Sequence, residues 1–379
     1  MGWSHCDLFD AGAPKAFTVP HAYTFDARGT QHVVYIGQAD NHVWEVSWEN
    51  DVWSPNDLTS LSGAPPQPAG NPINRPTGYV FSSQGTRHVV YTDSSGCIHE
   101  LWHDNSGWHH HDLTTDIGAP LSIVLPPCAY VFDSQGTQHV DYIGSDGCVN
   151  ELWWDHDGWH HNNLTNASGA PLALLPNATA PKGYIFEGTQ HVVYLAQDGN
   201  LHELFWQNFS WGHSPVTAIP RDAAPALGGS LAAYTFAPQG SQHVDYIGAN
   251  GGIFEVSNDN SGAHFDDLIS EAGPTTEAPT VMCAYPFDAQ GTRHVDFTGG
   301  TGHVIELWHD ANGWHHNDLT LASGGAPPAD QGDPAGYAFA AQGTQHVYYI
   351  GIDDNHIHEL RWQPITRPIL PVPSPLASR

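Results

Sequence analysis

Seven copies of a His–Glu pair are the residues of this chain best suited to hold a polar ligand. Twelve residues separate the two members in five copies, and thirteen in the first and last copies. A glutamate can accept two sugar hydroxyls, and a histidine can donate or accept a third hydrogen bond. The pairs are His32/Glu45, His88/Glu100, His139/Glu151, His191/Glu203, His243/Glu255, His294/Glu306 and His346/Glu359.

Tryptophans recur beside these pairs. One group stands two or three residues after the glutamate, and a second group opens the next apolar segment. A flat indole can pack against the C–H face of a sugar while polar groups hold its hydroxyls. Repeats two, three and six carry histidine, glutamate and tryptophan together. The candidate sugar-binding residues are His88, Glu100, Trp102, Trp108, His139, Glu151, Trp153, Trp159, His191, Glu203, Trp206, His294, Glu306, Trp308, Trp314, His346 and Glu359.

A purely structural role would give much of the same pattern. Histidine and glutamate persist even in the fifth repeat, where Ser257, Asn258 and Ala263 stand at tryptophan positions. A polar pair buried between neighbouring units, with each member satisfying the other, would also recur in every copy. Tryptophans at the start of the fourth strand are typical of core packing. The residues that vary between repeats, chiefly tryptophan, therefore indicate sugar binding better than the invariant ones.

The elements that must position these residues repeat about every 50 residues. Within residues 127–168, β-branched and aromatic segments at 129–132, 137–143, 148–154 and 159–165 predict four short strands separated by tight turns. No window shows a helical apolar period of useful length. Four antiparallel strands per unit predict an all-β fold, a β-propeller.

The chain ends predict how the propeller closes. The last repeat lacks a fourth strand, whereas residues 2–8 form a fourth strand without the first three. Together they complete one blade, which gives a seven-bladed ring spanning residues 1–363. We expect the blades at 17–62, 75–117, 127–168, 182–219, 230–271, 281–322 and 334–363 plus 1–10, with a Pro-rich tail at 364–379.

Charge and composition exclude several partners. Ten Lys and Arg stand against 40 Asp and Glu, so nucleic acid and anionic membrane surfaces would be repelled. No apolar run reaches the length that spans a bilayer, which predicts no membrane insertion. No signal peptide is visible, and the five cysteines include no C-x-x-C pair. We therefore expect a cytoplasmic protein, or one secreted without a visible leader.

Motifs for metals, cofactors and catalysis are missing from the sequence. The densest histidine cluster is His109–His111, but alternate residues of a strand face opposite ways, and no two-plus-two ligand spacing exists. The nucleophile elbow, the phosphate-binding loop and the dinucleotide fingerprint are all absent. We expect no metal, no cofactor and no enzymatic activity.

The repeat resembles the blade of fungal fucose-specific propeller lectins and of related tectonin-like and bacterial fucose-binding propellers. The resemblance rests on "HELW" followed by "DxxGW" and covers essentially the whole chain. It implies that an Arg and a Glu, with aromatic residues, hold a sugar between adjacent blades. Glu100 and its equivalents match that glutamate, but His88 fills the basic position, and Arg occurs only next to it, at Arg87 and Arg293. Those lectins commonly have six blades, against seven counted in this sequence.

The sequence thus predicts a seven-bladed propeller lectin with several similar sugar sites between blades, and fucose or a related neutral sugar is the expected ligand. Its expected partners are glycans or glycoconjugates. Two alternatives stay open from the sequence, because a fold alone does not choose a function. One is a protein–protein interaction scaffold, and the other is an enzyme with a pocket in the central channel.

Overall fold

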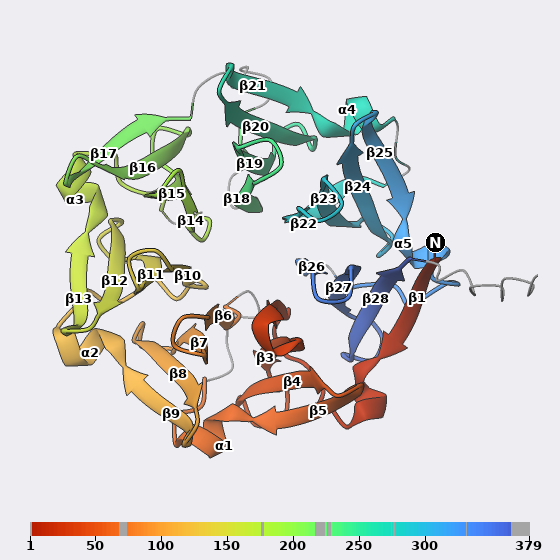
Figure 1. The fold of residues 1–379 in the computed structure, drawn as a ribbon, viewed down its shortest axis with the longest axis horizontal. Coiled ribbons are helices and arrows are strands. Elements are labelled where there is room, and N and C mark those ends of the chain that lie inside the picture. The colour runs from red at the N-terminus through yellow and green to blue at the C-terminus, as the bar shows by residue number, and fades with distance from the viewer. Residues whose placement is uncertain are drawn as a thin grey trace, which may run out of the picture.

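The computed structural model is a ring of seven four-stranded antiparallel sheets, as the sequence predicts (Figure 1). It describes residues 2–67, 74–175, 178–216, 224–225, 229–273, 275, 277–330 and 332–364. Residues 365–379 of the expected Pro-rich tail lie outside this description. The sheets are the blades, numbered 1 to 7 from the sheet that contains β2, and an interface is named by the two blades that form it.

Each blade runs outward from an inner strand at the ring axis to an outer strand at the rim (Figure 1). Blade 1 contains β2 (His21–Phe25), β3 (Thr30–Ile36), β4 (Val43–Glu49) and β5 (Val52–Asp57). Blade 2 contains β6 (Thr77–Phe81), β7 (Thr86–Thr92), β8 (Ile98–Asp104) and β9 (Gly107–Asp112). Blade 3 contains β10 (Cys128–Phe132), β11 (Thr137–Ile143), β12 (Val149–Asp155) and β13 (Gly158–Asn163). Blade 4 contains β14 (Lys182–Phe186), β15 (Thr189–Leu195), β16 (Leu201–Gln207) and β17 (Ser210–Pro215), and blade 5 contains β18 (Leu231–Phe236), β19 (Ser241–Ile247), β20 (Ile253–Asp259) and β21 (Gly262–Asp267). Blade 6 contains β22 (Pro279–Phe287), β23 (Thr292–Gly299), β24 (Val304–Asp310) and β25 (Gly313–Asp318). Blade 7 contains β26 (Ala335–Phe339), β27 (Thr344–Ile350), β28 (Ile357–Gln363) and β1 (Gly2–Asp7).

The hydrophobic core lies between blades. At interface 2/3, for example, Tyr79 and Val90 of blade 2 pack against Val140, Tyr142 and Leu152 of blade 3. Successive side chains of a strand point to opposite faces of its sheet. Each strand therefore sends alternate residues into two different interfaces, and a residue's place in that alternation decides which neighbouring blade it meets.

The two chain ends close the ring as predicted. Strand β1 pairs antiparallel with β28, which places Trp3 opposite Trp362 and Cys6 opposite Glu359. His356 Nδ1 also lies 2.9 Å from Asp7 Oδ2. This pairing covers the edge of β28 that would otherwise be open for association with another strand.

Short helices follow the outer strands, a feature that the sequence analysis missed. They are α1 (Leu58–Ser62), α2 (Leu113–Ile117), α3 (Leu164–Ser168), α4 (Leu268–Ala272), α5 (Leu319–Ala322) and the 3-10 turn η1 (Leu8–Ala11). A second 3-10 turn, η2 (Asp26–Arg28), follows the inner strand β2. The predicted fourth strand of blade 3 ran to Thr165, but β13 ends at Asn163, whose side chain accepts a hydrogen bond from the Asn166 N–H and caps α3. A helix of about one turn is too short to show a helical period. Among the described residues, none of the helices has the length and apolarity needed to cross a membrane.

Candidate functional site

All seven His–Glu pairs are formed. The histidine Nδ1 atom lies 2.7–3.0 Å from a glutamate oxygen in every blade. Its Nε2 atom lies 2.7–2.8 Å from the hydroxyl of the Thr or Ser two residues earlier. A tyrosine of the inner strand stacks on each ring, with centroids 4.9–5.4 Å apart. Both ring nitrogens therefore face polar atoms of the protein, although the His32 Nδ1 contact is not aligned as a hydrogen bond.

The strand register explains why the pairs form. In blade 6, His294 faces Trp308 across the strand pair, and Asp296 faces Glu306. His294 and Asp296 are two residues apart, as are Glu306 and Trp308, so all four side chains share one face of the sheet. The expectation that histidine and glutamate meet across the hairpin is confirmed.

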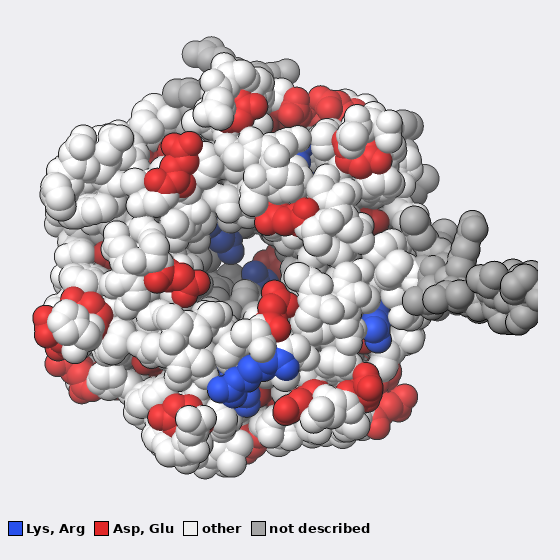
Figure 2. Space-filling view, viewed as in Figure 1, with Lys and Arg blue, Asp and Glu red and all other residues white. Residues whose placement is uncertain are grey.

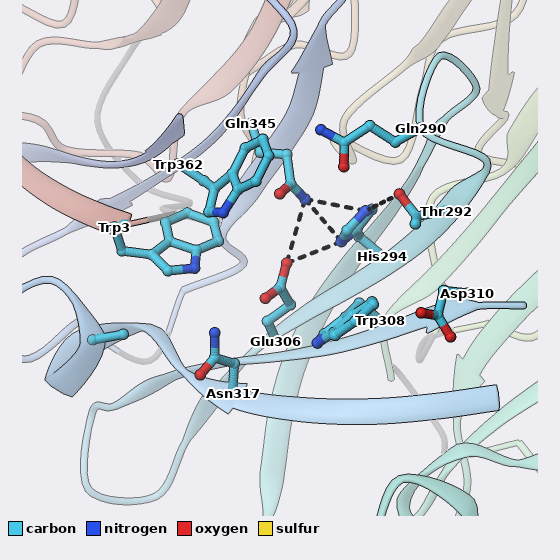
Figure 3. Close-up of a pocket in the computed structure, with 12 residues that line it drawn as sticks. Trp3, Gln290, Thr292, His294, Glu306, Trp308, Asp310, Asn317, Gln345 and Trp362 are labelled. Atoms are coloured by element: carbon cyan, nitrogen blue, oxygen red, sulfur yellow. Dashed lines mark hydrogen bonds and ion pairs between the residues drawn. The ribbon is translucent and has the colours of Figure 1, made fainter. Parts of the chain in front are cut away.

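That face opens into a pocket between blades 6 and 7 with a volume of about 670 Å³. Trp3 and Trp362 of blade 7 lie on one side of it, with Trp308 and His294 on the other (Figure 3). Glu306 lies between the two sides and accepts a hydrogen bond from Gln345 Nε2 at 3.3 Å. The lining also includes Asn317, Thr292, Gln290 and Asp310. The pocket thus combines three indoles with a carboxylate and amide groups, the composition expected of a small-ligand site.

The orientation of Trp308 is fixed by a histidine on the neighbouring strand. Its ring stacks on His315 with centroids 4.3 Å apart, and His315 Nε2 lies 3.0 Å from Asp310 Oδ1. The same arrangement recurs in blades 2 and 3, where Trp102 stacks on His109 and Trp153 stacks on His160. Each of these outer histidines is bonded to the aspartate five residues before it. The supporting histidine covers one face of the indole and fixes the orientation of the ring.

Interfaces 2/3 and 3/4 contain the same residue types as interface 6/7, except that His111 at 2/3 replaces the asparagine opposite the glutamate. At 3/4, Glu151 accepts hydrogen bonds from Gln190 Nε2 at 3.1 Å and from Asn162 Nδ2 at 2.9 Å. At 2/3, Gln138 of blade 3 lies 3.4 Å from Glu100. The tryptophans that these interfaces receive from the following blade are Trp154 and Trp159 at 2/3 and Trp206 and Trp211 at 3/4.

The register separates two tryptophan groups that the sequence analysis merged. Trp153 lies two residues after Glu151 and shares its face, whereas Trp206 lies three residues after Glu203 and points to the opposite face. Trp206 therefore packs in the cluster that joins blades 3 and 4, beside Trp211. The residue that shares a face with Glu203 is Phe205. Grouping Trp206 with His191 and Glu203 was therefore wrong; Trp206 belongs to the interface that contains Glu151.

The fourth-strand tryptophans follow the same rule. Trp108, Trp159 and Trp314 each face the blade that precedes their own, so Trp159 packs at the interface that contains Glu100 rather than at the one that contains Glu151. Trp314 is 7% exposed and packs between blades 5 and 6, together with Leu268 and Val295.

Arginine fills two of the interfaces. At 1/2, Arg87 Nη2 lies 3.3 Å from Glu45 Oε2, and its guanidinium lies over the Trp108 ring at 5.1 Å. At 5/6, Arg293 donates to Glu255 and lies over Trp314 at 5.2 Å. Burial alone would raise the pKa of Glu45, but the His32 ring and the Arg87 guanidinium together lower it to about 2. The carboxylates of these interfaces are neutralised by protein groups.

The two remaining interfaces have altered walls. At 4/5, Asn258 and Ala263 replace the two tryptophans of the following blade, and the cavity is about 150 Å³. At 7/1, Glu359 remains paired with His346, but Arg361 stands at the position of Trp308 and donates to Gln342. The unevenness that the sequence shows between repeats thus becomes unevenness between pockets.

A second buried carboxyl group faces the glutamate in blades 3, 5 and 6. Asp141, Asp245 and Asp296 are fully buried, and their side-chain oxygens make no hydrogen bond of ordinary geometry with the described residues. Burial, and then the charge of the facing Glu151, raise the pKa of Asp141 well above its ordinary value. Blade 2 has Val90 at this position.

Sequence reasoning overlooked the contribution of the following blade. Gln138, Gln190 and Gln345 each stand one residue before a repeated histidine, so the signal was present in the Gln-His dipeptide. Their side chains reach back into the preceding blade, which no spacing within one repeat reveals.

Clusters with metal-ligating atoms occur away from the pockets. In the described ranges they are Asp7/Asp354/His356, Asp40/His42/Asp57 and Asp155/His156/Asp157. In the first two, the aspartate of the outer strand caps the following helical turn and accepts from the histidine at 2.8–2.9 Å. Hydrogen bonding within the fold accounts for those contacts. The histidines 109–111 do not converge, because His109 bonds Asp104 and His110 bonds His99.

Comparison with known proteins gives relatives in structure but not in sequence. No protein-family model matches the chain, and no curated protein does. Similar solved structures include the BP39L lectin from Burkholderia pseudomallei, with a TM-score of 0.64, 12% identity and coverage of 92% of this chain and 96% of that one. The chain shares the fold of β-propeller lectins.

Two further solved structures carry sugars. The SapL1 lectin in complex with alpha methyl fucoside has a TM-score of 0.54 and 16% identity, covering 80% of this chain and 96% of that one. Aleuria aurantia lectin in complex with Fucalpha1-6GlcNAc has a TM-score of 0.52 and 16% identity, with the same coverage. The Aleuria fold is described as a six-bladed propeller, so the present chain carries one more blade.

Proposed function

We propose that this protein is a non-enzymatic lectin that binds sugars in pockets between blades, at interfaces 2/3, 3/4 and 6/7. The observation that carries the proposal is the pocket at 6/7, where Trp308, Trp362 and Trp3 surround the Glu306 carboxylate. Indole faces suit the C–H side of a sugar ring, and a carboxylate with neighbouring amides suits its hydroxyls. The sugars bound to the SapL1 and Aleuria lectins support fucose or a related neutral sugar as the ligand class.

In this proposal the repeated histidine positions the glutamate rather than contacting the sugar. His294 is 3% exposed, and both of its ring nitrogens face protein partners. The Nδ1–H donated to Glu306 and the Thr292 hydroxyl at Nε2 hold the ring in one orientation. The glutamate is thereby fixed with an oxygen toward the pocket, and a preorganised acceptor gains affinity because less side-chain entropy is lost on binding.

Three weak sites on one rigid ring suit a glycan surface. Interfaces 2/3 and 3/4 are neighbours, whereas 6/7 lies across the ring from them (Figure 1). Simultaneous binding to several sugars raises apparent affinity without new contacts, provided that the surface can span the sites. Isolated monosaccharides should therefore bind much more weakly than clustered glycans.

A glycan array followed by a monosaccharide soak tests the proposal. We expect binding to a neutral or deoxy sugar, and electron density for that sugar at 2/3, 3/4 and 6/7. A blank array would contradict the lectin assignment, and density only in the central channel would favour the enzyme alternative. Pull-down of a protein partner that free glycan does not displace would favour the scaffold alternative.

A further inference from the structure

A small cavity at the ring axis carries positive charge in a strongly acidic protein. Arg75 and Lys182 line this cavity, whose volume is about 300 Å³. Figure 2 shows Lys and Arg side chains inside the central opening, with acidic groups beside them, at its edge and over the surrounding face. The chain has only 10 Lys and Arg in total. Placing two of them at the axis makes the local charge opposite to that of the molecule.

Arg75 is fixed by residues from two other linkers. Its Nη1 atom lies 3.0 Å from Asp333 Oδ2, and the other oxygen of Asp333 accepts a hydrogen bond from Ser230 Oγ at 2.9 Å. These three residues precede the inner strands of blades 2, 7 and 5. Both oxygens of the Asp333 carboxylate are therefore already in use.

Lys182 has no such partner. It is the first residue of β14, and within the described ranges its ammonium group makes no hydrogen bond or ion pair. Burial, and then the nearby Arg75 charge, lower the pKa of Lys182 below its ordinary value. Lys182 is half-buried, and an ammonium that loses water without gaining a counter-ion is costly, so an anion placed beside it lowers that cost. Arg75, Lys182 and Asp333 together leave one positive charge uncompensated.

The neighbouring titratable groups also favour an anion. His21 Nδ1 accepts the Gly78 N–H at 3.2 Å, so the neutral ring keeps a proton on Nε2 as a donor. Burial and the charges of Arg75 and Lys182 lower the pKa of His21 to about 3, which keeps the ring neutral at physiological pH. Burial raises the pKa of the Cys283 thiol well above its ordinary value. The cavity thus offers donors, and among the described residues that line it no free carboxylate or thiolate competes for them.

We propose that the central cavity binds one small organic anion per chain through a single carboxylate, which pairs with the Lys182 ammonium. Arg75 and the Nε2–H of His21 supply further donors to the same carboxylate. The cavity volume sits at the lower end of the range for small-ligand sites, which favours a ligand of about monosaccharide size. This site is separate from the pockets between blades and does not depend on the lectin proposal.

Calorimetric titration with glucuronate tests the site, with glucose as the uncharged comparison. We expect 1:1 binding of glucuronate and no binding of glucose at the axis. The Lys182→Gln variant should bind about tenfold more weakly or worse, which corresponds to roughly 1.4 kcal/mol. The Asp333→Asn variant should bind several-fold more tightly, because it removes the carboxylate that offsets one positive charge.

Two controls keep the test decisive. Lys15→Gln removes an exposed lysine outside the cavity and should leave affinity unchanged, while Lys182→Arg retains the charge and should retain binding. Glucuronate should also bind when the glutamates at interfaces 2/3, 3/4 and 6/7 are all changed to glutamine, which separates this site from the lectin pockets. Equal binding by Lys182→Gln, loss of binding in Lys182→Arg, or no glucuronate binding at millimolar concentration would overturn the proposal.

Discussion

Gln345 of blade 7 donates to Glu306 of blade 6 across a distance of 3.3 Å. These residues lie 39 positions apart in the chain, and the same relationship joins Gln190 to Glu151. The candidate sugar-binding carboxylate is therefore held by its own blade through histidine and by the next blade through glutamine. Each site forms only when two blades have packed, so binding reports on the assembled ring.

Changing Glu100, Glu151 and Glu306 together to glutamine should abolish sugar binding while the ring stays folded. Glutamine keeps the size of the side chain but replaces a charged acceptor by a neutral amide, and hydrogen bonds to charged groups are worth about 1.5–3 kcal/mol each. Glycan-array signal and thermal unfolding would be measured on the same sample. Loss of the folded state instead would support a purely structural role for these glutamates.

Glu45→Gln is the matched control for that variant. Glu45 occupies the same position in blade 1, but Arg87 already pairs with its carboxylate. We expect unchanged sugar binding, with a loss of stability from the disrupted ion pair. A clear drop in sugar binding would show that interface 1/2 is also a binding site.

Trp308→Ala should mainly weaken sugar binding, whereas Trp314→Ala should mainly lower the stability of the fold. Trp308 faces the pocket at 6/7, so its loss should weaken binding there by about tenfold or more with a modest change in stability. Trp314 is buried between blades 5 and 6 beneath Arg293, so its loss should cost about 3–5 kcal/mol of folding free energy. Denaturant unfolding and calorimetry on each variant would separate the two effects. Equal effects on binding would contradict the assignment by face.

His139→Ala should destabilise the protein by about 1–3 kcal/mol, because Glu151 and Thr137 would lose their shared buried partner. Binding at interface 3/4 should fall as well, since the glutamate is no longer fixed. Thr137→Val tests this reading, because it removes only the hydroxyl at Nε2 and should reproduce part of the stability loss. Full stability in both variants would contradict the positioning role.

Asp141→Asn should raise stability at neutral pH. Burial and the facing Glu151 raise the pKa of Asp141 above its unfolded value near 3.9. The stability linked to this group is therefore fully present below the unfolded pKa and is lost as the pH rises toward the folded pKa. Asparagine is neutral at every pH, so the variant does not lose this stability. Its free energy of unfolding at neutral pH should be higher by roughly 1–3 kcal/mol.

The gain from Asp141→Asn should shrink as the pH falls toward about 4 and vanish below it, where the aspartic acid is protonated in both states. Thermal unfolding between about pH 4 and 8 would measure it. The exposed Asp133→Asn substitution in the same blade should show no such trend. A gain that does not depend on pH would point to packing rather than to proton binding.

The sequence by itself determined the architecture. The period of about 50 residues predicted four-stranded blades, and the missing last strand together with residues 2–8 predicted the closure seen between β1 and β28. It also predicted that each histidine lies near its glutamate across a hairpin, and the strand register of the structure, which decides whether the two share a face, confirms it. These are local relationships, settled by alternation along a strand and by turn length.

Only the tertiary structure decided which blade each side chain meets. Trp206 stands one position further from its glutamate than Trp153 does from Glu151, and that single step sends it to the other interface. Whether a pocket is open also depends on the following blade, which supplies Trp3 and Trp362 at 6/7 but Arg87 at 1/2. These partners come from a different repeat, so a pattern within one repeat identifies the residue types but leaves their neighbours undetermined.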